Sequence, residues 1–292
     1  MRLVLCLVLA VSACAQTGEK PDAVASDRDR RADSVVTRPD VRADSLATTD
    51  LAVTLGEGTV GVRVHTAPIT DPLGSPGFER FPLNALNLHD DEGTSVEAAL
   101  DVIGRRGGRL VELVHTGERN VAFTVDGQTV RADPNRMFTP AGRARTLASL
   151  SQADAAAEAA LAAFADSVLA VYAAVPPAVV VTLHNNTEAN YSAASYAPGA
   201  EYADDAEAVT VHDGTDPDDF FFVTDRALYA ALAARGFNAV LQDNAAATDD
   251  GSLSVWAARE GVPYVNVEAQ HGHRAEQAAM IDALLDVLGD RR

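Results

Sequence analysis

The stretch Ala178-Val179-Val180-Val181-Thr182-Leu183-His184 carries the strongest information about the fold of this chain. It follows Pro176-Pro177, and its continuous apolar and β-branched run is typical of a buried central strand. The run ends at a histidine, and Asn185 and Asn186 come next. Such amides can orient metal ligands or bind polar groups of a substrate. We therefore expect a central strand that brings His184 to one edge of a sheet.

Strand-like and helical patterns alternate outward from this run. Strands are expected at residues 60–64, 83–88, 109–115, 120–125, 220–223, 239–242 and 264–267. Helices are expected from a cap at Thr94 or Ser95 to Gly107, and at residues 151–174, 225–235, 253–260 and 274–288. This alternation predicts an α/β fold with a mixed, largely parallel central sheet flanked by helices.

Three residues whose side chains can bind a metal ion or transfer a proton lie at the ends of predicted strands. His89 follows residues 83–88, His184 ends the central run, and Glu268 follows residues 264–267. Open α/β sheets bind ligands at the carboxyl ends of their strands, so we expect these side chains to share a site. The segment after Glu268 also allows another interpretation, as a solvated polar loop or as the source of a metal ligand, His271 or His273.

The residue types in this set suit a transition metal. His89 and Glu92 lie three residues apart in Leu-His-Asp-Asp-Glu-Gly, a spacing that a surface loop can also show by chance. A lone histidine at a strand end, such as His184, can equally be structural. An acidic loop alone would favour calcium, whereas an adjacent imidazole favours zinc or a similar metal. Two imidazoles and one carboxylate are the usual protein ligands of a catalytic zinc ion.

The order of these motifs resembles that of the zinc carboxypeptidase superfamily, and in particular its branch with succinylglutamate desuccinylase and aspartoacylase. That superfamily carries His-x-x-Glu near a strand end, an Asn-Arg pair, a third histidine after an apolar strand, and a late glutamate. Asp133-Pro134-Asn135-Arg136-Met137-Phe138 is similar to the Asp-Leu-Asn-Arg-x-Phe of aspartoacylase-like members. The resemblance spans about residues 82–285 and implies a zinc carboxypeptidase-like fold.

The resemblance also implies a role for each metal-site residue. His89, Glu92 and His184 would bind Zn²⁺. Glu268 would act as general base toward the water that zinc activates, and then as general acid toward the leaving amine.

Further residues are implied to hold the substrate. Asn135 and Arg136 would bind its free carboxylate. Arg119 lies upstream of this pair at about the separation at which carboxypeptidases place an arginine that stabilises the oxyanion, an effect worth about 3–4 kcal/mol. Arg131 is the alternative for this role, because aspartoacylase-like members keep theirs closer to the pair.

The chain departs from the family pattern at several positions. Asp90-Asp91 stands where many aspartoacylase-like enzymes have Gly-Asn, and Pro134 stands where leucine is usual. The tyrosine that some carboxypeptidases carry near the scissile bond has no assigned counterpart, and three residues are nearby candidates: Tyr191, Tyr196 and Tyr202. These departures leave the identity of the substrate open.

The N-terminal residues predict export. Arg2 precedes the apolar run Leu3–Val11, which is far shorter than the roughly 20 residues that span a bilayer. Val11-Ser12-Ala13-Cys14 resembles the lipobox of bacterial lipoproteins, so residues 1–14 are expected to be a lipoprotein signal peptide and Cys14 a lipidated membrane anchor. The alternative is an ordinary signal peptide. The protein is expected in the cell envelope, facing the periplasm.

Composition divides the rest of the chain in two. Residues 15–50 are polar and lack apolar periodicity, as in a disordered tether. Residues 51–292 are expected to form the catalytic domain. The formal net charge of −19 argues against binding to nucleic acid. The only cysteines, Cys6 and Cys14, lie in the signal segment, so the domain has neither a disulfide nor a thiol nucleophile.

Together these patterns predict an exported, lipid-anchored zinc hydrolase that cleaves an amide bond next to a free carboxylate. The expected substrate is a small peptide or an N-acyl amino acid. The alternative function is a catalytically inactive envelope lipoprotein that binds zinc and a ligand. A third hypothesis is a structural lipoprotein in which the metal-like residues are coincidental. The sequence has no Gly-x-Ser-x-Gly elbow and no phosphate-binding glycine loop.

Overall fold

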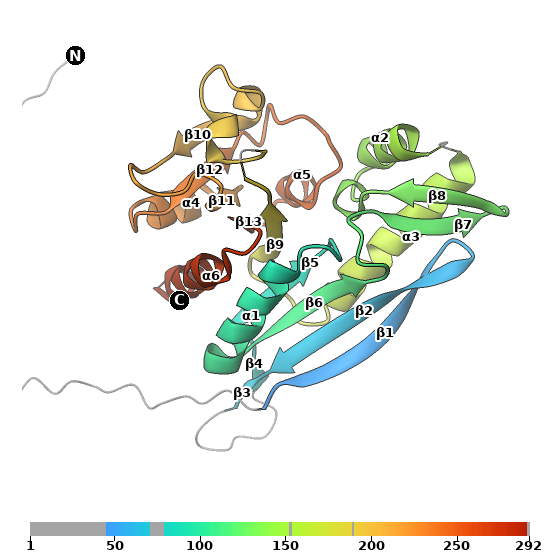
Figure 1. Ribbon diagram of the computed structural model, residues 1–292, viewed down its shortest axis with the longest axis horizontal. Coiled ribbons are helices and arrows are strands. Elements are labelled where there is room, and N and C mark those ends of the chain that lie inside the picture. The colour runs from blue at the N-terminus through green and yellow to red at the C-terminus, as the bar shows by residue number, and fades with distance from the viewer. Residues whose placement is uncertain (1–44, 71–78, 152–153, 189, 291–292) are drawn as a thin grey trace, which may run out of the picture. The chain divides into compact units, whose positions relative to one another are not determined.

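Strand β9 (Val180–Asn186), which contains the central run, lies in the middle of a nine-stranded sheet among the described residues (Figure 1). All seven of its residues are buried. The order across the sheet is β1 (Ala47–Leu55), β2 (Gly58–Ala67), β6 (Gly108–Val114), β5 (Leu83–Asn87), β9, β13 (Tyr264–Gln270), β11 (Phe220–Val223), β12 (Asn238–Gln242) and β10 (Ala206–Thr210).

The sheet is mixed, and its centre is parallel. Strands β6, β5, β9 and β13 run parallel to one another, and β11 runs parallel to β12. The β1–β2, β2–β6, β11–β13 and β10–β12 pairs are antiparallel. The predicted mixed α/β sheet with flanking helices is therefore confirmed.

The computed structural model describes residues 45–70, 79–151, 154–188 and 190–290, which belong to one compact unit, Asp40–Arg292. The expected signal peptide and lipobox, at residues 1–14, lie outside the described residues, as does most of the expected tether. Strand β1 begins at Ala47, so the end of the segment 15–50 belongs to the sheet.

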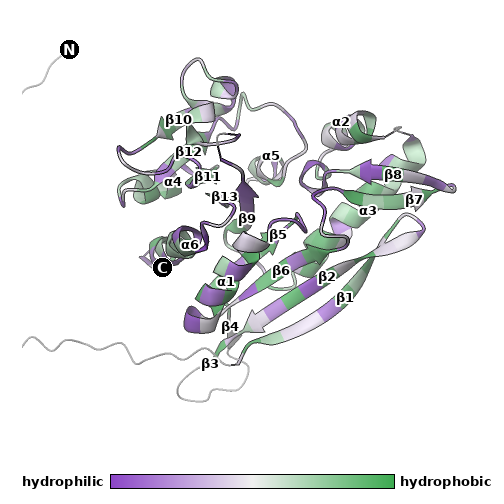
Figure 2. Cartoon of the chain, in the orientation of Figure 1, coloured by the Kyte–Doolittle hydropathy of each residue, from purple (hydrophilic) through white to green (hydrophobic). Residues whose placement is uncertain are grey.

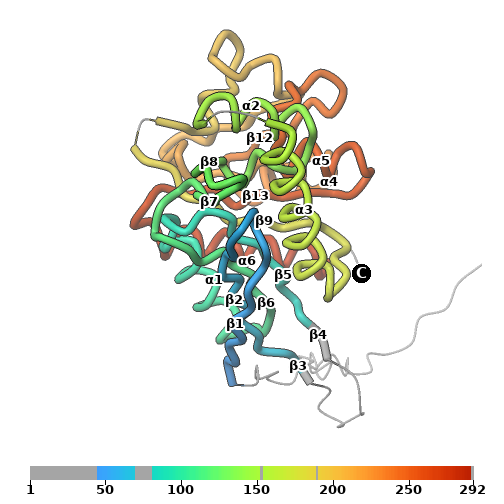
Figure 3. The backbone as a smooth tube through the Cα atoms, turned by 90° about the vertical axis from the view of Figure 1, so that its right-hand side faces the viewer, coloured from blue at the N-terminus to red at the C-terminus, as the bar shows by residue number. Residues whose placement is uncertain are grey.

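Helices cover both faces of the sheet. Helices α1 (Gly93–Arg106), α4 (Arg226–Ala233) and α6 (Arg274–Asp290) share one buried cluster with Val181 and Leu183 of β9. Helices α2 (Pro140–Leu150), α3 (Ala155–Tyr172) and α5 (Leu253–Arg259) share the other with Val180. Figure 3 shows α1 and α3 on opposite sides of β2 and β6. Because side chains alternate along a strand, His184 lies on the α3 side and Asn185 on the α1 side.

Helix α3 is long and apolar enough, by length and composition, to cross a membrane (Figure 2). This is weak evidence, because the core helix of a soluble protein meets the same criteria. One face of α3 packs into the core through Leu161, Phe164, Val168 and Tyr172. The side chain of Asp154 caps the helix by accepting from the backbone N–H of Ala157.

Several local predictions differ from the structure. The strand expected at 120–125 exists as β7 (Val121–Val125), but it pairs with β8 (Gln128–Ala132) in a separate two-stranded sheet. A second small sheet consists of β3 (Ile69–Thr70) and β4 (Glu79–Arg80). The helix expected at 151–174 begins at Ala155, and α2 precedes it. Helix α1 has its N-cap at Glu92, so the predicted cap at Thr94 or Ser95 was wrong.

Candidate metal centre and substrate pocket

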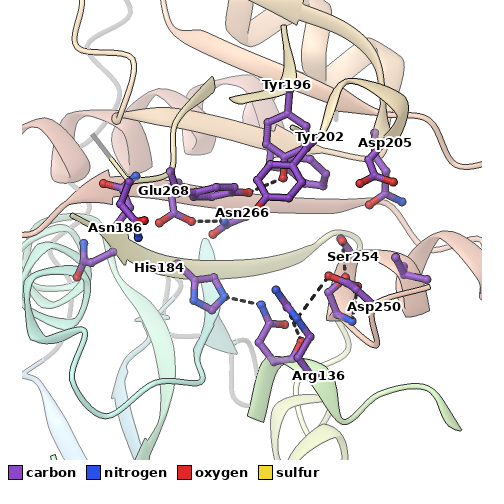
Figure 4. Close-up of a pocket in the computed structure, with 18 of the residues that line it drawn as sticks. Arg136, His184, Asn186, Tyr196, Tyr202, Asp205, Asp250, Ser254, Asn266 and Glu268 are labelled. Atoms are coloured by element: carbon purple, nitrogen blue, oxygen red, sulfur yellow. Dashed lines mark hydrogen bonds and ion pairs between the residues drawn. The ribbon is translucent and has the colours of Figure 1, made fainter. Parts of the chain in front are cut away.

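The predicted metal-binding residues meet at the carboxyl ends of the central parallel strands. His89 lies two residues beyond β5, and Glu92 occupies the N-cap position of α1, directly before Gly93. His184 lies near the end of β9, and its Cα is the register partner of Glu268 on the neighbouring parallel strand β13. Figure 4 shows His184 and Glu268 projecting from neighbouring strands into one pocket.

His89, Glu92 and His184 form a tight, buried cluster. His89 Nδ1 lies 2.7 Å from Glu92 Oε1, and His184 Nδ1 lies 2.9 Å from Glu92 Oε2. The two Nδ1 atoms are 3.1 Å apart. The exposed fractions of the three residues are 1%, 1% and 5%. Among the described residues, this is the one group of histidines, cysteines and carboxylates close enough together to hold a metal ion.

The donor set fits a zinc ion. Two imidazole nitrogens and one carboxylate are the ligands that catalytic zinc sites use. Ligand atoms bound to a tetrahedral zinc ion stand about 3.3 Å from one another, slightly farther apart than the atoms of this cluster. The three side chains therefore need only a small expansion to accept the ion. His271 is exposed and His273 pairs with Asp219 at 2.9 Å, so neither belongs to the cluster.

The charges of the cluster are strongly coupled. Burial is the largest influence on Glu92 and opposes its ionisation, but His89 and His184 together hold its pKa well below the usual range. Burial also disfavours a charge on His89, yet the carboxylates of Glu92 and Asp133 raise its pKa to about 9. The pKa of His184 is lowered, because burial and the neighbouring His89 outweigh its attraction to Glu92. Without a metal, the positive charge therefore resides on His89.

Asp133 supports the cluster in a way that the sequence patterns did not reveal. Its Oδ1 lies 2.9 Å from His89 Nε2, on the opposite side of the ring from Glu92. A carboxylate at that position fixes which imidazole nitrogen faces the metal and raises the basicity of the ligand. Asp133 belongs to the Asp133–Phe138 motif, so the motif itself was the available signal. Its carboxylate also accepts from the backbone N–H of Asn135, which shapes the turn.

The two candidate oxyanion arginines lie in different places. Arg119 Nη1 donates to Glu92 Oε1 at 2.9 Å, and its Nε lies 3.6 Å from Asp133. Arg131 is exposed on β8 and lines neither cavity described below. Of the two, Arg119 therefore lies beside the metal cluster.

The Asn135-Arg136 pair lies in a short 3₁₀ turn, Pro134–Arg136, at the wall of the pocket. Asn135 Nδ2 lies 3.5 Å from His184 Nε2, and Asn135 Oδ1 accepts from the backbone N–H of Leu253. Arg136 Nη1 donates to the carbonyl of Asn135, and its Nε lies 3.5 Å from Asp250. The pair is thus held in place beside a metal-cluster residue.

The loop before α5, which contains Asp249 and Gly251, packs against and hydrogen-bonds to the segment that follows the Asn135-Arg136 turn. Thr139 Oγ1 donates to Asp249 at 2.6 Å, and the backbone N–H of Phe138 donates to the carbonyl of Gly251. Gly251 has a φ of +87° and packs against Gly142 so closely that a Cβ at either position would collide with the other. Backbone packing and aspartate side chains therefore tie this loop to the Asn135-Arg136 turn.

Glu268 faces the same cavity from β13. It is 5% exposed, and Asn266 Nδ2 donates to its Oε2 at 2.8 Å. Burial, and next the negative charge of Glu92, raise the pKa of Glu268 to about 8. A buried carboxyl group whose proton exchanges near neutral pH is suited to general acid–base chemistry.

The cavity measures about 820 Å³ and extends from the metal cluster to the loop before α5. Tyr191, Tyr196 and Tyr202 all line it, and the hydroxyl oxygens of the first two are 2.5 Å apart. A smaller cavity of about 330 Å³ shares Arg119 and Arg136 with it. The three tyrosines therefore lie on the wall of the pocket.

Asn185 and Asn186 point to opposite sides of β9. Asn186 lines the pocket, and its Nδ2 donates to the carbonyl of Asp218. Its Oδ1 has no hydrogen-bond partner within the described part of the chain. Asn185 borders the pocket, but its amide group is directed toward α1 and α6.

No protein-family model matches the chain, and no curated protein has a significant sequence match. Several solved structures are similar to it, and two of them are described here. One is murein-tripeptide amidase MpaA from Escherichia coli O157, with 15% identity, a TM-score of 0.41, and coverage of 86% of this chain and 95% of that chain. The other is thrombin activatable fibrinolysis inhibitor, with 9% identity, a TM-score of 0.47, and coverage of 82% and 68% respectively. Each alignment covers more than four fifths of this chain.

Proposed function

We propose that this chain is a zinc-dependent hydrolase that cleaves an amide bond next to a free carboxylate. The observation that carries the proposal is the convergence of His89, Glu92 and His184 in one buried cluster, with Glu268 and Arg136 lining the same cavity. The fold that the family resemblance implied, a mixed sheet with flanking helices, is the fold found.

Glu268 is the proposed general base. A bound zinc ion would polarise the substrate carbonyl and bring the pKa of its water to about 7. Glu268 lies beside His184 in the strand register and can take up a proton there. Asn266 holds one carboxylate oxygen and leaves the other for proton transfer. After the attack, the same carboxyl group would return the proton to the leaving amine.

Two arginines and an amide would hold the substrate. Arg136 and Asn135 would bind its free carboxylate, since a guanidinium can donate two parallel hydrogen bonds to it. Arg119 lies beside the cluster and would stabilise charge that develops on the attacked carbonyl oxygen.

The size of the cavity favours a small peptide or an N-acyl amino acid as substrate. Its volume of about 820 Å³ lies within the range of small-molecule sites. Arg136 lies on the wall of this same cavity, so a terminal carboxylate can reach it while the neighbouring amide lies at the cluster.

The proposal is tested by metal analysis followed by a substrate screen. We expect about one zinc ion per purified chain, and hydrolysis of N-acyl amino acids or dipeptides by the zinc-loaded protein. Amidating the carboxyl terminus of a cleaved substrate should abolish its hydrolysis. Stoichiometric zinc without cleavage of any such compound would instead support the alternative, an inactive protein that binds zinc and a ligand.

We further propose that the protein is anchored in the cell envelope through lipidated Cys14, with its domain facing the periplasm. The support is the sequence Val11-Ser12-Ala13-Cys14 after an apolar run. Mass spectrometry of the mature N-terminus tests this proposal. A diacylglyceryl-modified Cys14, absent in Cys14→Ala, is expected, whereas cleavage elsewhere without lipid would identify an ordinary signal peptide.

A further inference from the structure

The N-terminus of α1 is capped in an unusual way. Glu92 is the N-cap residue, but its side chain makes no capping hydrogen bond among the described residues, and its carboxylate turns to the histidines instead. The backbone N–H of Ser95, in the first turn, donates to Asn185 Oδ1 at 2.8 Å. Helix N-termini need such acceptors for their free N–H groups. The same N–H also lies 3.2 Å from the carbonyl oxygen of Glu92. The side chain of Asn185, the residue next to His184, therefore supplies the capping acceptor that the side chain of Glu92 does not.

Asn185 makes three hydrogen bonds with its amide and is 5% exposed. Besides accepting from Ser95, its Nδ2 donates to the carbonyl of Ala269 at 3.1 Å and to Gln277 Oε1 at 3.0 Å. Both N–H groups and the oxygen of the side chain are used. Asn185 thus joins β9 to α1, β13 and α6 at once.

Gln277, on α6, completes the connection behind the cluster. Its Nε2 donates to the carbonyl of His184 at 2.9 Å and to that of Val267 at 3.0 Å. On the other side, Ser95 Oγ donates to the carbonyl of Glu92 at 2.8 Å. Both Ser95 and Gln277 are 0% exposed. Ser95, Asn185 and Gln277 thus form one connected set of hydrogen bonds between the backbone carbonyls of Glu92 and His184. The same set includes the carbonyl of Val267, the residue before Glu268.

We propose that Ser95, Asn185 and Gln277, which we call the buried amide frame, are positioning residues of the metal centre. The frame fixes the backbone of Glu92 and His184 so that their ligand atoms face each other, and it fixes β13 so that Glu268 stays beside them. The inference rests on the metal centre of the proposed function. Ser95 and Gln277 line neither of the two cavities near the cluster. Asn185 borders the larger one, but its amide oxygen and nitrogen are bonded to Ser95, Ala269 and Gln277, so the frame acts through the ligands.

Physical arguments favour a role of the frame in positioning the metal ligands over a role in simply holding α6 against the sheet. A buried amide left without a partner costs about 1–3 kcal/mol, so apolar packing alone would be the simpler way to hold α6 on the sheet. A fully connected polar network specifies one arrangement of the groups that it joins. Metal ligands need such an arrangement, and loss of their supporting partners typically lowers metal affinity about 10- to 100-fold.

A second buried amide in this chain provides a matched control. Asn84 lies near the start of β5, at the end of that strand away from His89, and is 8% exposed. Its Nδ2 donates to the carbonyl of Val175 at 2.9 Å, and its Oδ1 accepts from Arg109 at 3.0 Å. Replacing Asn84 removes a comparable set of buried hydrogen bonds without touching the frame.

The test compares Gln277→Met and Ser95→Ala with Asn84→Leu in the full chain. For each, the free energy of unfolding of the metal-free protein is measured by urea titration. The dissociation constant for Zn²⁺ is measured by competition with a chelating indicator, and the visible absorption spectrum of the Co²⁺ form is recorded. Ser95→Ala is the milder change, and it keeps the test valid if Gln277→Met does not fold.

We expect both frame variants to bind Zn²⁺ about 10- to 100-fold more weakly and to show an altered Co²⁺ spectrum. Asn84→Leu should lose stability while keeping the affinity and spectrum of the wild type. Equal losses of affinity in all three variants, or none in the frame variants, would overturn the inference. Metal binding by the wild type without hydrolysis would overturn only the proposed reaction. A wild type that binds neither ion would overturn the inference together with the metal centre.

Discussion

Glu268 and His184 are direct register partners on the adjacent parallel strands β13 and β9. Neighbouring strands lie about 4.8 Å apart, and register partners present their side chains on the same face of a sheet. The proposed general base and a proposed metal ligand are therefore held together by the backbone hydrogen bonds of the sheet and by no loop. This rigidity makes their roles separable by mutation.

Glu268→Gln should separate hydrolysis from metal binding. Glutamine keeps the shape of the side chain but cannot take up a proton, so we expect kcat to fall by about 10²- to 10⁴-fold. The zinc content should remain that of the wild type, because Glu268 is not a member of the cluster. Glu260→Gln, at an exposed position, is the control and should leave both quantities unchanged. Unaltered turnover in Glu268→Gln would remove Glu268 from the mechanism.

His184→Ala should abolish stoichiometric zinc binding while the chain stays folded. The substitution removes one of the three converging ligand atoms, a larger loss than that of a supporting partner, so we expect zinc affinity to fall by more than about 100-fold. Elemental analysis of the purified variant measures the effect, and circular dichroism checks the fold. His273→Ala is the matched control, since His273 pairs with Asp219 outside the cluster. Full zinc occupancy in His184→Ala would mean that the metal binds elsewhere.

The sequence could predict the sheet centre and the candidate ligands because both depend on local patterns. The β-branched run before His184 matches its burial as a central strand, and the apolar run before His89 likewise forms a parallel neighbour. Strand ends in a parallel sheet share one edge, so the meeting of these residues follows from the topology.

The rest of the site depends on contacts between distant segments. Asp133 reaches His89 across 44 positions, and Gln277 reaches His184 across 93. No periodicity marks such a pair, because each residue looks locally like an ordinary polar residue of a turn or helix. The predicted N-cap of α1 was wrong for the same reason, because the side chain that accepts from the first turn of α1 is that of Asn185 on the distant strand β9. The clamp on the Asn135-Arg136 turn likewise depends on the packing of Gly142 against Gly251.

Metal affinity should rise with pH up to about 9. In the metal-free chain the pKa of His89 is raised to about 9, as the carboxylates of Glu92 and Asp133 outweigh the opposing effect of burial. This interaction stabilises the metal-free fold fully below the ordinary histidine pKa, and the contribution is lost as the pH rises through 9. A metal must displace that proton, so affinity should increase about tenfold per pH unit between 7 and 9.

Calorimetric titration with Zn²⁺ in buffers of different ionisation enthalpy measures the proton released. About one proton per ion is expected at pH 7.5, and fewer are expected above pH 9. Asp133→Asn should lower the pKa of His89 and shift the profile to lower pH. A pH-independent affinity would mean that His89 is already neutral in the metal-free chain.

Gly251→Ala should weaken the proposed binding of the substrate carboxylate by Arg136, and Gly261→Ala serves as its control. Both glycines have positive φ, +87° and +68°, so alanine at either carries a backbone cost of about 1–2 kcal/mol. At Gly261 a Cβ has no heavy atom within 4 Å, whereas at Gly251 it collides with the carbonyl oxygen of Arg136 and with Gly142. Only the Gly251 variant should therefore displace Arg136. We expect it to unfold at lower urea concentration than Gly261→Ala and to raise KM for carboxylate substrates severalfold, with a smaller change in kcat. Equal KM values in the two variants would show that the Asn135-Arg136 turn can move without weaker binding of the substrate carboxylate.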